Sequence, residues 1–146
     1  MAKVHTLTVP DLVWINLQVS GSTQPFDYAR LEEGTFYQFG HKGDSSLATR
    51  AARFLTGFPK LAPFNSFNEQ TAIFATLAFL EGNGLVVSDD PVQAMDWLRS
   101  LGTEFEDVRT GLQAKVDAGL RPSHGLPDFQ NLVTQYDVTK YGATKE

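Results

Sequence analysis

Residues 67–84, with the sequence FNEQTAIFATLAFLEGNG, decide the fold of this 146-residue chain. Apolar residues occupy nearly every side of a helix between Phe67 and Glu81, and Gly82-Asn83-Gly84 follows as a stop signal. A helix that is apolar almost all round lies in the middle of a fold rather than on its surface. The sequence therefore predicts a buried central helix over residues 67–81, entered by the loop 62–66.

Helical patterns also dominate the rest of the chain. Three pairs of residues are typical of helix starts: Thr8 with Asp11, Asp90 with Pro91, and Thr103 with Glu106, the last as a capping box. Gly34 and Pro59 are expected to end helices. These signals predict a mostly α fold, with a helical domain over residues 1–120 and a linker with a C-terminal helix or tail of the same domain over 121–146. The expected helices span residues 9–19, 27–33, 44–58, 67–81, 91–101, 103–119 and 128–136.

The composition excludes several classes of function. The chain has no cysteine, so disulfides, thiolate metal sites and a cysteine nucleophile are ruled out. Twelve Lys and Arg residues against seventeen Asp and Glu residues give a net charge of -5, which argues against nonspecific nucleic-acid binding. No apolar run approaches the ~20 residues that a bilayer requires. We therefore expect a cytoplasmic protein with no nucleic-acid or membrane partner.

The segment between Gly34 and Gly43 is aromatic and bounded by glycines. Alternation of Phe36, Tyr37 and Phe39 with other residues predicts a short strand or β flap. Most aromatic side chains belong to the core, but a strand edge can also present them to a partner chain. Both interpretations of these three residues stay open at this point.

The stretch from Ala51 to Val87 resembles the core of the Fic/Doc (death-on-curing) family. The family has a helix, a loop that begins His-x-Phe and continues to a small residue, Asn and a cationic pair, and then an apolar helix that ends in Asn-Gly. In this chain the loop reads APFNSFNEQTA over residues 62–72, and the helix ends at Gly82-Asn83-Gly84. The resemblance implies a Fic/Doc-like helical bundle around the buried central helix, with a short β flap that holds a peptide.

The family's reactive residues are replaced in this chain. Members transfer a nucleotide-derived group to a protein hydroxyl, and the resemblance places Ala62 where they have the general base. Ser66 stands at the position of the acidic metal ligand, and Glu69 and Gln70 stand at the positions of the two phosphate-pairing cations. Phe67 replaces a small residue that lets backbone approach phosphate. We therefore expect no catalytic residue, no metal site and no cofactor.

The family residues that persist have structural uses. Phe64 is expected to fill the core below the loop, and Asn68 is expected to hold loop backbone groups at the start of the helix. Together with Asn65 and the aromatic residues Phe36, Tyr37 and Phe39, they are the candidate binding residues. Glu69 introduces negative charge at a helix start, where an anion would otherwise be attracted.

Other candidate chemistry is sparse in this sequence. His5, His41 and His124 share no spacing typical of metal ligands. His41 lies in the expected flap. The side chains that could supply different chemistry in a rebuilt catalytic site are those of Ser66, Asn65, Glu69 or His41.

Three hypotheses about function follow from these residues. The first is a catalytically inactive Fic/Doc-like protein that binds a protein or peptide at the flap, as a decoy, a regulator or a toxin–antitoxin-related protein. The second is an enzyme with a rebuilt Fic-type site that transfers a nucleotide-derived group to a protein. The third is a structural domain that forms homo-oligomers through its C-terminal helix.

Overall fold

The computed structural model describes residues 4–39, 46–121 and 127–136, and these residues are mostly helical. No strand forms within these ranges, in which one isolated bridge pairs Phe26 with Phe64. The mostly α class expected from the sequence is therefore confirmed. The helices are α1 (Val9–Ser20), α2 (Tyr28–Phe36), α3 (Leu47–Leu61), α4 (Asn68–Gly82), α5 (Pro91–Ser100), α6 (Phe105–Ala118) and α7 (Phe129–Thr134).

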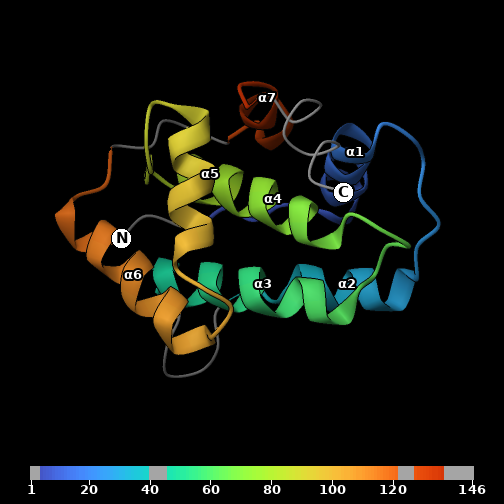
Figure 1. Cartoon of the computed structure of the whole chain (residues 1–146), viewed down its shortest axis with the longest axis horizontal. Coiled ribbons are helices and arrows are strands. Elements are labelled where there is room, and N and C mark those ends of the chain that lie inside the picture. Colours follow the sequence, from blue (N-terminus) through green and yellow to red (C-terminus); the bar gives the residue numbers. More distant parts are fainter. Residues whose placement is uncertain (1–3, 40–45, 122–126, 137–146) are drawn as a thin grey trace.

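Helix α4 forms the centre of the fold. Every residue from Gln70 to Leu80 is buried, which is the environment that an apolar pattern on all sides requires. Figure 1 shows α4 running through the middle of the molecule, with α2, α3 and α6 on one side and α1 and α7 on the other. Helix α5 contacts α4 as well. The buried central helix is confirmed, with bounds one residue from those expected.

Several helix starts follow the capping signals of the sequence. Thr8 and Asp11 exchange hydrogen bonds between side chain and backbone at the start of α1. Asp27 and Asp90 accept hydrogen bonds from the first turns of α2 and α5. The capping box expected from Thr103 is wrong, because α6 begins one residue later behind Glu104, whose side chain makes no capping bond.

The β flap expected over 34–43 is wrong for the described part of that segment. Residues 34–36 form the last turn of α2, and residues 37–39 continue as a turn and a bend, while residues 40–43 lie outside the described ranges. Gly34 lies inside α2 and does not end it. The absence of a side chain at this position lets α2 pack closely on α3, since a Cβ would lie 2.7 Å from Cδ1 of Phe58. In the same way, a Cβ at Gly57 would lie 2.7 Å from the Tyr37 ring.

Helix α3 also runs past its expected end. Pro59 lies inside its last turn, and the helix ends at Leu61. Phe58 is fully buried, with its ring centroid 5.0 Å from that of Phe54 and 6.4 Å from that of Phe64. This packing holds the backbone before the proline in a helical conformation that local preference disfavours.

The amino-terminal segment is attached to the helices by side-chain amides. The Gln38 carboxamide accepts from the Leu7 N–H at 2.7 Å and donates to the Leu7 carbonyl at 3.0 Å. Asn83 makes the same two-point contact with His5, at 2.8 and 2.9 Å. Two amide side chains thus pair with single backbone residues much as a neighbouring strand would.

Candidate functional site

The loop in front of α4 begins and ends on left-handed residues. Ala62 caps α3 with a φ of 48°, and Phe67 precedes α4 with a φ of 65°. They are the two residues other than glycine with positive φ in the described part of the chain. This conformation costs about 1–2 kcal/mol for each such residue, so other contacts of the loop must hold it in place.

Asn68 supplies one of those contacts. Its carboxamide accepts from the Phe64 N–H at 2.9 Å and donates to the Phe64 carbonyl at 2.8 Å. The Phe64 ring is buried, between Phe58 and the ring of Phe26, whose centroid is 5.7 Å away. The structural roles expected of Phe64 and Asn68 are both confirmed.

A buried polar network holds the other half of the loop. The Asn16 amide on α1 donates to the Ser66 carbonyl and to the Thr71 hydroxyl, each at 3.1 Å. The Thr71 hydroxyl donates to the Phe67 carbonyl at 2.7 Å, and the Ser66 hydroxyl donates to Gln24 at 2.9 Å. Sequence reasoning missed Asn16, although a single amide on the apolar face of α1 was a signal for a buried partner.

The other candidate residues between 62 and 70 lie in different environments. Ala62, Asn65 and Glu69 are exposed, Ser66 is half-buried, and the side chain of Gln70 faces inward and is buried. Within the described residues, no group of three or more His, Asp or Glu side chains lies close enough to hold a metal ion. The backbone of His5 is held by Asn83, and His41 and His124 lie outside the described ranges.

Aromatic side chains are exposed at both ends of α2. The exposed fractions are 59% for Phe36 and 41% for Phe39, and their ring centroids lie 5.6 Å apart. Phe26 and Tyr28, at the start of the helix, are 43% and 58% exposed. Phe26 precedes α2 and Phe39 follows it; together with Tyr28 and Phe36, in the first and last turns, we call them the aromatic face of α2.

Tyr37 differs from its neighbours. Its ring packs against Gly57, and its hydroxyl donates to a Glu33 carboxylate oxygen at 3.1 Å. Partial burial, together with this hydrogen bond and the Glu33 charge, raises the pKa of Tyr37. The core interpretation therefore applies to Tyr37, which packs inward. Phe36 and Phe39 face outward, but from the end of α2 and the bend after it, so the strand edge expected for them is wrong.

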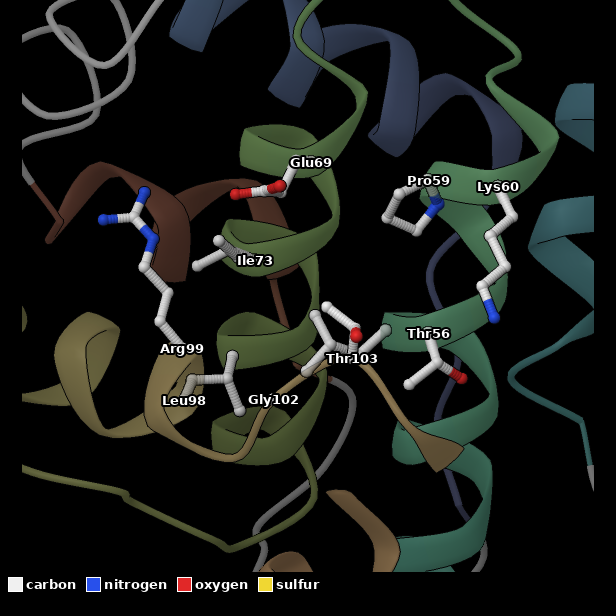
Figure 2. Close-up of a pocket in the computed structure, with 10 residues that line it drawn as sticks. Thr56, Pro59, Lys60, Glu69, Ile73, Leu98, Arg99, Gly102 and Thr103 are labelled. Carbon is white, nitrogen blue, oxygen red and sulfur yellow. The ribbon is translucent and has the colours of Figure 1, made fainter. Parts of the chain in front are cut away.

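A cavity of about 270 Å³ opens between α3, α4 and the end of α5 (Figure 2). Among residues 62–72, Glu69 is the one that lines the cavity, so the structure separates Glu69 from the other candidate residues. Sequence reasoning missed this cavity, because its walls come from separate parts of the chain. The lining residues are Leu55, Thr56, Pro59, Lys60, Glu69, Ile73, Leu98, Arg99, Gly102 and Thr103.

Comparison of the chain with protein-family models, with curated proteins and with solved structures found no match. Among the helices within the described ranges, none combines the length and apolar character needed to cross a membrane.

The C-terminal helix α7 packs on α4 and α1 of its own chain, with Val133 fully buried.

Proposed function

We propose that this chain is a catalytically inactive, Fic/Doc-like protein that acts by binding another protein through the aromatic face of α2. The observation that carries the proposal is the exposure of four aromatic side chains between residues 26 and 39. In the described ranges, two other large apolar side chains are comparably exposed, Leu17 at 38% and Leu120 at 47%. Single exposed apolar residues are ordinary, but a group of them is typical of an interaction surface.

The geometry of α2 suits a partner of protein size. Eight residues separate Tyr28 from Phe36, which corresponds to about 12 Å along the axis and about 80° around it. Both side chains therefore lie on one broad side of the helix, with Glu32 between them. Aromatic residues contribute most of the binding free energy at many protein interfaces, because they bury large areas at a small entropic cost.

The loop supports the inactive part of the proposal. The polar groups of Ser66, Asn68 and Thr71 are all engaged in hydrogen bonds that hold the loop. Group transfer would need a base and cations at this helix start, where Glu69 instead supplies a negative charge. The loop thus uses its side chains to maintain its own shape.

The binding proposal is tested with a photo-crosslinking residue at position 36 and, as a matched control, at position 17. A protein captured at 36 and not at 17 is purified, and its affinity is measured by calorimetry. Phe36→Ser or Phe39→Ser is expected to weaken this binding by about thirtyfold or more, as truncation of an anchoring aromatic does. Leu17→Ser should leave the affinity unchanged, since it removes a similarly exposed side chain elsewhere. Equal effects of Phe36→Ser and Leu17→Ser would contradict the proposal.

The inactive site is tested separately. The natural chain is incubated with labelled ATP, Mg²⁺ and candidate target proteins, beside a variant with Ala62→His, Ser66→Asp, Phe67→Gly, Glu69→Lys and Gln70→Arg. Phe67→Gly also relieves the left-handed backbone at this position. We expect no label transfer by the natural chain, because the base, the metal ligand and both cations are replaced together. Transfer by the natural chain would refute this part of the proposal.

A further inference from the structure

The cavity between α3, α4 and α5 has an apolar interior. Leu55 and Pro59 line it from α3, Ile73 from α4 and Leu98 from α5. Ile73 and Leu98 are almost wholly buried, so they form the floor, and the turn at Gly102 and Thr103 closes one side (Figure 2). An apolar floor of this kind favours a hydrocarbon group over water.

The size of the cavity limits its occupant. An apolar cavity of about 150 Å³ accommodates benzene, so a volume of about 270 Å³ holds a ring or a branched chain with a few further atoms. Ligand pockets commonly measure roughly 300–1,000 Å³, so this cavity lies just below the lower end of that range and suits a small ligand. The occupant is therefore about the size of one large apolar side chain with its head group.

The charges at the opening specify that head group. Glu69 from α4 and Arg99 from α5 extend to the same end of the opening, whereas Lys60 lies on the α3 side (Figure 2). No ion pair within the described ranges involves Lys60, Glu69 or Arg99. A carboxylate and a guanidinium that share one end of an apolar cavity, without pairing with each other, complement a ligand that carries both charges.

We infer that this cavity binds a free apolar α-amino acid, with the side chain inside and the head group at the opening. The ligand's ammonium group pairs with the Glu69 carboxylate, and its α-carboxylate pairs with the Arg99 guanidinium, which can hold a carboxylate by two parallel hydrogen bonds. Thr103 lines the same cavity on the side that the 102–103 segment closes, away from Glu69 and Arg99. This inference is independent of the proposed protein binding, since the cavity and the aromatic face of α2 share no residue.

The test is titration of the full chain with L-phenylalanine and L-leucine, followed by calorimetry and by NMR shifts of the lining residues. Two analogues separate the head-group contacts: phenylalaninamide lacks the carboxylate, and N-acetylphenylalanine lacks the ammonium charge. We expect saturable binding of the amino acids and at least tenfold weaker binding of either analogue, because each has lost one charged hydrogen-bonded contact.

Variants assign each contact to a side chain. Arg99→Gln is expected to weaken phenylalanine binding about tenfold and to leave the binding of phenylalaninamide unchanged. Glu69→Gln is also expected to weaken phenylalanine binding about tenfold, but to leave the binding of N-acetylphenylalanine unchanged. Lys60→Gln, a matched exposed control, should change neither affinity. Thr56→Phe fills the cavity and should abolish binding in a protein with an unchanged circular dichroism spectrum. Absence of saturable binding would overturn the inference. The inference would also be overturned if N-acetylphenylalanine bound as tightly as phenylalanine and its binding depended on Lys60, because that result indicates a simple anion site.

Discussion

At the scale of single residues, two buried threonines of α4 differ in the hydrogen bonding of their hydroxyl groups. The hydroxyl of Thr71 accepts from Asn16 and donates to the Phe67 carbonyl, whereas the hydroxyl of Thr76 has no hydrogen-bond partner. Both side chains are fully buried on the same helix. A buried hydroxyl without a partner keeps its desolvation cost, while a bonded one recovers that cost and orders its neighbours.

Thr76→Val is therefore expected to raise the free energy of unfolding by about 1 kcal/mol, since valine keeps the shape and removes the unpaired hydroxyl. Thr71→Val is the matched control and should lower the free energy of unfolding by about 1–3 kcal/mol, because Asn16 loses a partner. Both values come from urea unfolding monitored by circular dichroism. A loss of stability in Thr76→Val would mean that its hydroxyl is hydrogen-bonded in solution.

At the scale of elements, α2 and α3 approach closely through paired glycine and aromatic contacts. Gly34 of α2 faces Phe58 of α3, and Gly57 of α3 faces Tyr37 just after α2. A glycine inside a helix usually weakens it, by about 1 kcal/mol relative to alanine. In α2 the absence of a side chain is what allows the two helix axes to come together.

Gly34→Ala is accordingly expected to destabilise the protein, by about 1–2 kcal/mol, although helix propensity alone predicts a gain. The added methyl would meet the Phe58 ring, which is fully buried and packed against Phe54 and Phe64. The measurement is the change in unfolding free energy in the natural background and in a Phe58→Leu background. We expect Gly34→Ala to be tolerated in the Phe58→Leu background, because the Phe58 ring has been removed. An equal loss of unfolding free energy in both backgrounds would show that the Phe58 ring is not the obstacle.

At the scale of the whole molecule, the last described residues return to the central helix. Tyr136 packs against Phe74 with a centroid distance of 6.2 Å, and its hydroxyl donates to a Glu81 carboxylate oxygen at 3.0 Å. Burial, followed by the Glu81 charge and the hydrogen bond to it, raises the pKa of Tyr136. The contact joins the end of α4 to the segment that follows α7.

This contact predicts how the stability of the whole fold depends on pH. The folded pKa of Tyr136 lies above its unfolded value of about 10, so the contribution is fully present below pH 10 and is lost as the pH rises beyond it. Above pH 10 the unfolding free energy of the natural protein should fall by up to about 1.4 kcal/mol per pH unit more than that of Tyr136→Phe. Urea unfolding of both proteins between about pH 8 and 11 provides the comparison. Parallel pH profiles would show that Tyr136 ionises freely in the folded protein.

Much of the candidate loop was accessible from the sequence, because its main contacts are local. Asn68 lies four residues from Phe64, and the pattern around them was enough to predict that one fills the core and the other holds backbone. Asn16 and Gln24 were not predicted, since each reaches the loop across more than forty residues of chain. The cavity was missed for the same reason.

The sequence by itself determined the elements whose signals are local: the buried central helix, set by an apolar pattern on all sides, and the starts of α1, α2 and α5, set by capping side chains. Only the tertiary structure decided the outcomes at Gly34 and Pro59, where packing against Phe58 outweighs the local preference to end a helix. The tertiary structure also decided which aromatic residues face outward and which charged side chains line the cavity. Those outcomes depend on contacts between distant segments, and the burial of a large aromatic side chain such as Phe58 contributes about 3–5 kcal/mol, against local penalties of about 1 kcal/mol for glycine and about 3 kcal/mol for proline inside a helix.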